Sequence, residues 1–424
     1  MLLLSCFYFY SCGTTQSTGS SQGDISHHQP PAAPAEIKKE PIVPPTEKKL
    51  PGKNEYTIAM LLPFQGSKVF ITDLNESSEY YFPEESQLAA EYYQGAMIAL
   101  DTLKKMGLKA KMVVYDVGMD TTQLKKRLLE PDLKSADLII GPVGNSSLKI
   151  TCEFSMKNKI WLVSPFSVTA IGNNPNPYYL LANATMRTHC EKIYDYISKN
   201  KPAGKVILLY RKRPAELELV KYFKDYQLLQ ESISGNSLRF IELTDSSEKK
   251  IGQVKEFLFD DHRNLIIIPS NDALFVRNVI KQLNGITDGF LMDVFGMPTW
   301  INFDLIPQEQ LANTSTHITQ NFWLDKTSVT ATHFKDMYVR EFNMNPSDYA
   351  VKGYDQVMYF GSLLLKNGTD LEDSFKKNGT SELAERFSLE PVPVPGNTKG
   401  VWYYENKSVY MLRYEEDTLK RIPD

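Results

Sequence analysis

Residues 141–147 combine small, hydroxyl and amide side chains directly after the short apolar run Ile139-Ile140. The polar members of this segment are Asn145, Ser146 and Ser147. Side chains of this kind cap helices, and the free backbone N–H groups at a helix N-terminus attract a carboxylate or another anion. The segment is therefore a candidate ligand-binding loop that leads into a helix.

Residues 164–169 form a second loop of similar character after the apolar run 161–163. Its candidate ligand contacts are Ser164, Phe166, Ser167 and Thr169. Open α/β sheets bind ligands at the carboxyl ends of their strands, so two such loops on neighbouring strands would face each other. Helix capping explains each loop when it is taken alone, whereas the two loops together favour a binding site.

Motifs for catalysis are missing from the sequence, which has no Walker A loop, GxGxxG fingerprint, GxSxG elbow or HExxH helix. The six histidines are scattered along the chain: His27, His28, His189, His262, His317 and His333. A Ser-His-Asp triad can assemble from any order in the sequence, but no pattern points to one. We expect no enzymatic activity, no cofactor and no metal ion.

Short apolar runs alternate with amphipathic stretches from about residue 56 onward, and each run predicts a strand that is buried in a parallel sheet. The runs are residues 57–62, 111–116, 137–141, 160–164, 206–210, 239–243, 265–269 and 291–295. Residues 87–105 have the clearest helical period, with Leu88, Tyr92, Ala96, Leu100 and Leu103 on one face. Repeated strand, helix and strand predict a doubly wound α/β sheet.

The alternation restarts after residues 177–181, with a new first strand at Val206. A single eight-stranded sheet would also fit, but a chain of this length more often forms two cores. Two successive Rossmann-like lobes are the simpler interpretation. Residues 401–404 and 409–414 flank Asn406-Lys407 and predict a C-terminal β-hairpin.

The composition restricts the partners of this chain. Asp and Glu total 51 against 47 Lys and Arg, and the resulting formal charge of −4 offers no attraction to nucleic acid. Hydrophobic residues make up 42% and charged residues 23%, as is usual for globular proteins. No run of 18 apolar residues is present that would span a bilayer.

The first residues resemble the end of a bacterial lipoprotein signal, because an apolar run reaches Tyr10 and is followed by Ser11-Cys12-Gly13. Cys12 is the expected lipid anchor and Cys6 the alternative, although no Lys or Arg precedes either cysteine. A buried N-terminal strand is the competing interpretation. Residues 13–54 are rich in Ser, Gln and Pro and predict a disordered tether. Cys152 and Cys190 are expected in the core.

Five segments in order resemble the type I periplasmic binding proteins, in particular the leucine/isoleucine/valine-binding branch of ABC-transporter receptors. They are residues 58–66, 93–100, 139–147, 163–165 and 346–355. The resemblance implies two lobes that are joined by three crossovers and close over a ligand. Lobe 1 would comprise residues 55–184 and 318–388, and lobe 2 residues 185–317 and 389–424.

The resemblance also implies roles for single residues. Ser146, Ser147, Ser167 and Thr169 would hold a ligand carboxylate, with Gln65 nearby. The contacts from lobe 2 would fall near Tyr210 and near Ser270, Asn271 and Asp272, of which Asp272 would meet an ammonium group.

Three departures from the family pattern put an amino-acid ligand in question. Val168 replaces a hydroxyl, and residues 210–214 replace a tyrosine-glycine turn with a run that contains Arg211-Lys212-Arg213. Such a run is more often a solvated surface than an anion site. Residues 68–85 are an insertion with Tyr80, Tyr81 and Phe82 that could cover the cleft or contact a partner.

Residues 92–96 and 295–300 resemble lipid-anchored, binding-protein-like envelope proteins of Bacteroidota-type bacteria, although no LysM module is present. Three hypotheses follow. The first is a periplasm-facing, lipid-anchored receptor for an amino acid or a short peptide-like ligand, with an ABC permease as a partner. The second is a ligand-free scaffold or regulator of cell-wall synthesis that binds a protein partner. The third, a glycosyltransferase-like enzyme, lacks support because no phosphate loop is present.

Overall fold

The computed structural model describes residues 53–424 except for 69, 75–76, 82, 170–173, 202–203, 231–237, 244–251, 376–379, 382, 417 and 424. Cys12, the expected signal segment and nearly all of the expected tether lie outside this part of the chain. Within it, none of the helices is long and apolar enough to cross a bilayer.

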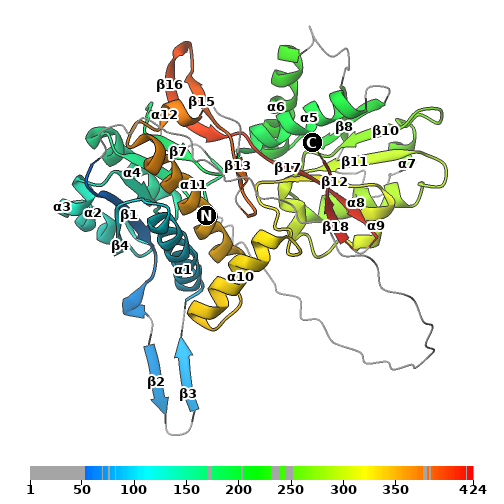
Figure 1. The fold of residues 1–424 in the computed structure, drawn as a ribbon. Coiled ribbons are helices and arrows are strands. Elements are labelled where there is room, and N and C mark those ends of the chain that lie inside the picture. Colours follow the sequence, from blue (N-terminus) through cyan, green and yellow to red (C-terminus); the bar gives the residue numbers. More distant parts are fainter. Residues whose placement is uncertain are drawn as a thin grey trace, which may run out of the picture. The chain divides into compact units, whose positions relative to one another are not determined.

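Seven strands form the first sheet, in the order β15-β16-β7-β6-β5-β1-β4 (Figure 1). In chain order they are β1 (Tyr56–Leu62), β4 (Ala110–Asp116), β5 (Leu138–Ile140), β6 (Trp161–Ser164), β7 (Tyr179–Leu181), β15 (Leu389–Val394) and β16 (Asn397–Asn406). Every neighbouring pair is parallel except β15 and β16. The inner strands β1, β5 and β6 are buried throughout, which explains their continuous apolar sequences.

Helices cover both faces of the first sheet. Ile58 and Met60 of β1 pack in the core formed with α1 (Glu84–Lys105) and α11 (Asp348–Asn367). Ala59 and Leu61 point to the opposite face, because side chains alternate along a strand. That face packs against α2 (Thr121–Arg127) and α4 (Asn145–Asn158), with α3 (Pro131–Lys134) alongside.

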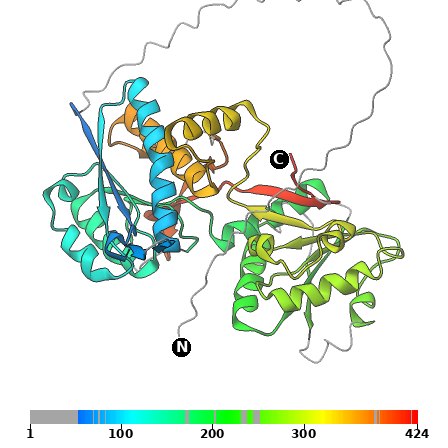
Figure 2. The same cartoon turned by 90° about the horizontal axis from the view of Figure 1, so that it is seen from below.

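Helix α1 lies side by side with α11, as two views of the molecule show (Figures 1 and 2). A Cβ atom on Gly95 of α1 would lie 1.8 Å from the carbonyl oxygen of Ala350. A Cβ atom on Gly353 of α11 would lie 2.0 Å from the carbonyl oxygen of Tyr92. The two glycines therefore allow the helix backbones to touch. Helix α10 (Val329–Phe342) adds a small cluster in which Phe334 and Tyr338 pack near α11.

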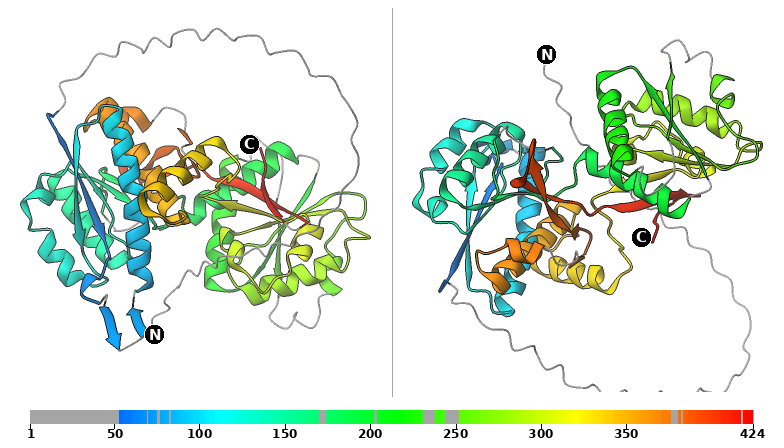
Figure 3. Two further views of the ribbon diagram at one scale, coloured as in Figure 1. Left: turned by 60° about the horizontal axis from the view of Figure 1, so that its bottom comes forward. Right: turned by 90° about the horizontal axis from the view of Figure 1, so that it is seen from above.

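Seven further strands form the second sheet, in the order β18-β17-β12-β11-β10-β8-β9. Figure 3 shows the chain from two further sides. They are β8 (Lys205–Arg211), β9 (Arg239–Leu243), β10 (Asn264–Ile267), β11 (Met292–Gly296), β12 (His317–Gln320), β17 (Tyr410–Glu415) and β18 (Thr418–Arg421). The helices of this lobe are α5 (Met186–Asn200), α6 (Pro214–Gln230), α7 (Gly252–Lys255), α8 (Ala273–Asn284) and α9 (Gln308–Asn313), with the 3-10 helix η3 (Pro298–Asn302).

All eight predicted strands form, and they are divided between two sheets. The fold is therefore α/β with two lobes, and a single eight-stranded sheet is excluded. The buried, unpaired thiols of Cys152 and Cys190 confirm the prediction that both residues belong to the core.

The predicted C-terminal hairpin is wrong. Residues 401–404 belong to β16, which pairs with β7 and β15 in the first sheet. Strand β17 instead pairs with β12 and β18 in the second sheet. The short link around Lys407 therefore carries the chain from one lobe to the other. Residues 389–406, which the predicted domain boundary assigned to lobe 2, form strands β15 and β16 of the first sheet. The alternation of apolar residues shows that both segments are strands but does not identify their partners.

Residues 68–85 contain a hairpin of their own after the 3-10 helix η1 (Gly66–Lys68). Strands β2 (Phe70–Leu74) and β3 (Ser77–Tyr81) pair only with each other, between β1 and α1 (Figure 1). Phe82 lies outside the described residues. A second small pair, β13 (Thr380–Ser381) and β14 (Arg386–Phe387), follows α12 (Glu372–Phe375).

Candidate functional site

The loop after β5 ends in a helix that no side chain caps. Gly144 is the N-cap residue of α4, with φ at 98°, and Asn145 and Ser146 are exposed in the first turn. Ser147 is buried, and its carbonyl oxygen accepts a hydrogen bond from the Thr151 hydroxyl at 3.0 Å. Among the described residues, therefore, no side chain caps the first N–H groups of α4, which point out of the helix.

Gly141 shapes this loop. Its φ is 97°, and a Cβ atom there would lie 2.2 Å from the carbonyl oxygen of Leu61 in the adjacent strand β1. Only glycine fits such a position, because a side chain would meet both the unfavourable φ and the neighbouring backbone.

The loop after β6 leaves the strand that neighbours β5, as predicted. Ser164 is buried at the end of β6, and the Phe166 ring packs edge-on against Tyr92 with 5.3 Å between centroids. The Ser167 hydroxyl donates to the carbonyl oxygen of Thr169 at 2.9 Å and accepts from the Thr169 N–H at 3.3 Å. Ser167 thus stabilises its own turn, and Thr169 is exposed.

Gln65 follows β1 in a backbone conformation with φ at 48° and is 5% exposed. Its N–H donates to Asp116 at 3.0 Å, and its side-chain amide donates to Glu85 at 3.2 Å. The amide oxygen accepts from Lys68 at 2.6 Å. All polar groups of the Gln65 side chain therefore have partners within the first lobe.

The candidates of the second lobe have partners as well. Tyr210 is buried in β8, and this burial raises the pKa of its phenol. Asn271 is exposed after β10 and accepts a hydrogen bond from Thr299 at 2.7 Å. Asp272 is the N-cap of α8, where one carboxylate oxygen accepts the N–H groups of Leu274 and Phe275 at 3.1 Å.

Arg211 departs from the solvated surface that its basic run predicts. Only 6% of the residue is exposed, and its guanidinium pairs with Glu216 and, at 3.0 Å, with Asp272. Partial burial raises the pKa of Asp272, but the N–H of Phe275 and the Arg211 cation outweigh it and hold the pKa below its usual value.

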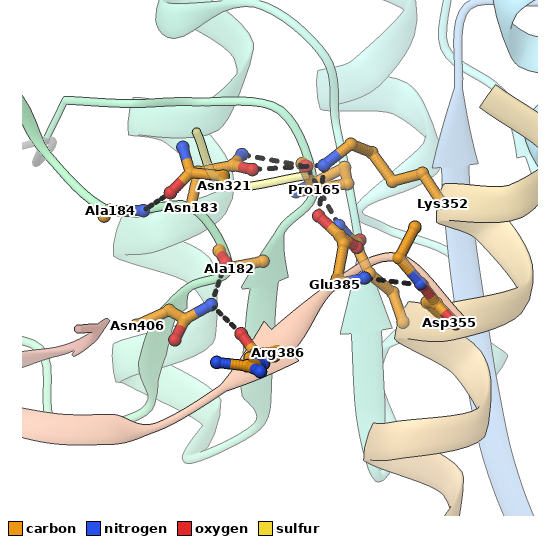
Figure 4. A network of polar contacts seen from close by, with 12 residues as sticks. Pro165, Ala182, Asn183, Ala184, Asn321, Lys352, Asp355, Glu385, Arg386 and Asn406 are labelled. Atoms are coloured by element: carbon orange, nitrogen blue, oxygen red, sulfur yellow. Dashed lines mark hydrogen bonds and ion pairs between the residues drawn. The ribbon is translucent and has the colours of Figure 1, made fainter. Parts of the chain in front are cut away.

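A network of polar residues at the crossovers has no counterpart in the sequence-based predictions (Figure 4). Lys352 of α11 pairs with the buried carboxylate of Glu385 and donates to Asn183 at 3.1 Å. Asn183 in turn donates to the carbonyl oxygens of Pro165 and Ser167, at 3.1 and 3.2 Å. The candidate ligand loop after β6 is therefore tied to the segments that join the lobes.

Asp355, one turn from Lys352 on α11, holds residues 383–385, which pair with the second crossover through the bridge between Phe322 and Glu385. Its carboxylate accepts the N–H groups of Leu383, Ala384 and Glu385 at 2.7 to 2.8 Å. Burial, together with the neighbouring Glu385 charge, raises the pKa of Asp355 to about 8 despite these three donors. Burial also raises the pKa of Glu385, although Lys352 opposes that effect.

All three crossovers share these contacts. The Ala184 N–H of the first crossover donates to Asn321 of the second at 3.0 Å. Asn406 of the third donates to the carbonyl oxygen of Ala182 at 2.9 Å. The Thr185 hydroxyl donates to Glu405 at 2.8 Å. The first connecting segment thus contacts both of the other two directly.

Little in the sequence could have identified this network. Lys352 and Asp355 lie within the motif at residues 346–355, so their region was marked, but Asn183, Glu385 and Asn406 are single polar residues in unremarkable contexts. The partners named above are 16 to 224 positions away from them in the chain.

A cavity lies at the amino ends of the strands of the first sheet, away from the candidate loops. Its volume is about 660 Å³, and its lining includes Lys53, Asp137, Lys159, Trp161 and Glu372. Across the described ranges, no cluster of three or more His, Cys, Asp or Glu residues could hold a metal ion.

No family model matches the sequence, and no curated protein matches it. Solved structures do match the fold. The first is an ABC transporter substrate-binding protein from Desulfitobacterium hafniense in complex with Leu, with 13% identity, a TM-score of 0.54 and coverage of 87% of this chain and 100% of that chain. The second is a branched-chain amino acid ABC transporter periplasmic ligand-binding protein from Burkholderia xenovorans LB400, with 10% identity, a TM-score of 0.57 and coverage of 87% and 94%.

These similarities concern the fold. Both fold neighbours are described as binding proteins of ABC transporters. The two mixed, mostly parallel sheets of this chain form two lobes as in the type I periplasmic binding proteins.

Proposed function

We propose that this protein is an extracytoplasmic solute-binding protein that captures a small carboxylate-bearing ligand between its two lobes. Amino acids and short peptides belong to that ligand class. Anchorage through a lipid on Cys12, a position on the periplasmic side of a membrane and delivery to an ABC permease belong to the same proposal.

The observation that carries the proposal is the open N-terminus of α4. Within the described part of the chain, its first N–H groups have no side-chain cap, and the exposed residues Asn145 and Ser146 belong to the same helical turn. The helix dipole and these donors favour a negatively charged group. The helix follows β5, and the loop of Phe166 and Ser167 follows the neighbouring strand β6, where α/β folds bind ligands. In the second lobe, by contrast, Asp272 already caps α8.

The test places a negative charge at this helix end. We expect wild-type protein to be stabilised by at least one member of a panel of amino acids, peptides and simple carboxylates at millimolar concentration, as measured by thermal shift and calorimetry. Ser146→Asp should lower the affinity for that ligand at least tenfold, because the new carboxylate repels the ligand. The fold should survive, because a carboxylate in a first helical turn is favourable.

Val329→Asp is the matched control. Val329 is 85% exposed in the first turn of α10, so the substitution adds the same charge to a different helix start. Equal losses of affinity in both variants, or a panel without any stabilising member, would count against the proposal.

A second candidate function is a ligand-free scaffold that binds a protein partner in the cell envelope. It is favoured by the polar groups of Gln65, Ser167 and Asp272, which have partners within their own lobes. Crosslinking in whole cells distinguishes the two functions: a specific protein partner together with a silent ligand panel supports the scaffold.

A further inference from the structure

Two buried amide side chains hold the loop after β6. Asn183 of the first crossover donates from its side-chain nitrogen to the carbonyl oxygens of Pro165 at 3.1 Å and Ser167 at 3.2 Å (Figure 4). Gln356 of α11 is fully buried, and its side-chain nitrogen donates to the carbonyl oxygen of Pro165 at 3.1 Å. In the part of the chain that the structure describes, residues 165–169 make no backbone–backbone hydrogen bond. The two amides therefore take the place of backbone bonds in fixing this loop.

Each amide is oriented by a donor at its other end. The oxygen of an amide only accepts hydrogen bonds, and its NH₂ group only donates them. Lys352, which has no acceptor, donates to the Asn183 oxygen at 3.1 Å. The Tyr92 hydroxyl donates to the Gln356 oxygen at 2.8 Å. Because these donors engage the two oxygens, both NH₂ groups face the loop.

The amides also determine which way two peptide groups of the loop point. The C=O and the following N–H of a trans peptide lie on opposite sides of the chain, and both peptides here are trans. The carbonyl oxygens of Pro165 and Ser167 point toward the buried amides, so the N–H groups that follow them point away. A carboxylate that approaches from the far side therefore does not meet the negative ends of these peptide dipoles.

We infer that Asn183 and Gln356 are positioning residues, which hold the loop of residues 165–169 in the orientation that admits a carboxylate ligand. The inference rests on the proposed function, in which this loop borders the ligand. The effect of both residues passes through the loop, because their nitrogens donate to its carbonyl oxygens. Lys352 and Tyr92 act one step further away, by orienting the amides.

The first experiment removes the hydroxyl that orients Gln356. Tyr92→Phe keeps the ring that packs against Phe166 and leaves the amide free to rotate away from Pro165. Tyr338→Phe is the matched control. Tyr338 is a buried tyrosine of α10 whose hydroxyl likewise donates to a glutamine oxygen, that of Gln94 on α1.

Cleavage by chymotrypsin after Phe166 reports the order of the loop without any ligand. The fragment masses identify the bond that is cut. We expect Tyr92→Phe to be cut at this bond at least threefold faster than the wild-type protein, and Tyr338→Phe to be cut at the wild-type rate. Equal rates in Tyr92→Phe and the wild-type protein, or the same increase in both variants, would overturn the inference.

The second experiment removes an amide without adding a charge. Asn183→Ser should be cut after Phe166 at least tenfold faster, because both of its donors to the loop are lost. Its affinity should also fall at least tenfold, in calorimetry, for the tightest-binding member of a panel of leucine, glutamate, alanyl-alanine and glutarate. Asn264→Ser is the control, because Asn264 is a fully buried amide that donates to carbonyl oxygens of the second lobe. Equal changes in both variants would show only a loss of stability and would refute the positioning role.

Tyr92→Phe carries the test if Asn183→Ser does not fold, since it leaves both amides in place. Its affinity for the same ligand should fall at least threefold, whereas Tyr338→Phe should bind as the wild-type protein does. An unchanged affinity of Tyr92→Phe overturns the inference. If the wild-type protein binds no member of the panel, the proposed function fails, and the cleavage rates still decide whether the amides hold the loop.

Discussion

The Lys352 ammonium group lies 3.1 Å from the side-chain oxygen of Asn183 and pairs with Glu385. These residues lie among the segments that connect the lobes. The Lys352 and Glu385 side chains are 14% and 2% exposed. Glu385 therefore depends on Lys352 for the neutralisation of its charge. Through Asn183, the pair also holds the carbonyl oxygen of Pro165 in the candidate ligand loop.

Lys352→Met should destabilise the protein by about 3 kcal/mol or more, because it leaves the Glu385 carboxylate buried without a cation. Lys352→Met combined with Glu385→Leu should recover most of that loss, because an apolar pair of similar volume replaces the ion pair. Urea denaturation of the two variants measures the difference. A double variant that is no more stable than the single one would contradict this account.

At the scale of single residues, the sequence identified side chains capable of chemistry but not their partners. Asp272 was correctly marked as a carboxylate at a strand end, yet its oxygens bind α8 and Arg211. Local spacing could predict the helix cap, since Asp272 directly precedes α8. The pairing with Arg211, 61 positions away, arises only when β8 and β10 become neighbours.

At the scale of elements, α1 and α11 show that helix periodicity predicts which face is buried but not which helix packs against it. The apolar period predicts the buried face of α1, and four of the five residues predicted on it, Tyr92, Ala96, Leu100 and Leu103, are buried, whereas Leu88 is half-buried. Gly95 would instead be expected to weaken a helix. Its presence is explained by the contact with Ala350, which the sequence does not reveal.

Gly95→Ala should destabilise the protein by about 3 kcal/mol, because the added methyl group would overlap the backbone of α11 and push the helices apart. Gly285→Ala is the control. Gly285 has φ at −71° at the end of α8, and its nearest contact to an added Cβ would be 3.5 Å away. That variant should change the free energy of unfolding by less than about 1 kcal/mol. Thermal unfolding of both variants provides the comparison, and similar losses would contradict it.

Strand pairing was the least predictable property of the elements. All eight runs were correctly predicted as strands, because short apolar sequences are typical of parallel sheets. Their predicted burial is wrong for the edge strands β4 and β9, which are only partly buried. The segments before and after Lys407 look like a hairpin, since a short polar link separates two apolar runs. Only the contacts of Asn406 and Glu405 with the first crossover show that the link passes between lobes.

For the molecule as a whole, two buried histidines link stability to pH. The Nδ1 atom of His189 and the Thr319 hydroxyl share a hydrogen bond of 2.8 Å. The His317 ring stacks on Phe295 with 4.8 Å between centroids. Burial lowers the pKa of each to about 4 from 6.5, although Glu405 opposes the shift for His189 and Asp293 opposes it for His317.

Both histidines therefore stay neutral in the folded protein at a pH where the unfolded chain binds protons. Their contribution to stability is complete above pH 6.5 and is lost as the pH falls from 6.5 toward 4, at about 3 kcal/mol for each residue. Urea denaturation at pH 7 and pH 4.5 should show this loss. His317→Phe should reduce the loss by about 2 to 3 kcal/mol, whereas His333→Gln, at an exposed position, should leave it unchanged. An unaltered loss in His317→Phe would contradict the assignment.

The order of the strands has a consequence for biosynthesis. Strand β16 covers the edge of β7, and β17 covers the edge of β12. Neither sheet can therefore be completed until the ribosome has added these late residues of the sequence. Until about position 415 has emerged, each nascent half exposes unpaired N–H and C=O groups along a strand that other chains could join. The two halves should thus reach a protease-resistant state together, after translation has passed that point, instead of one after the other.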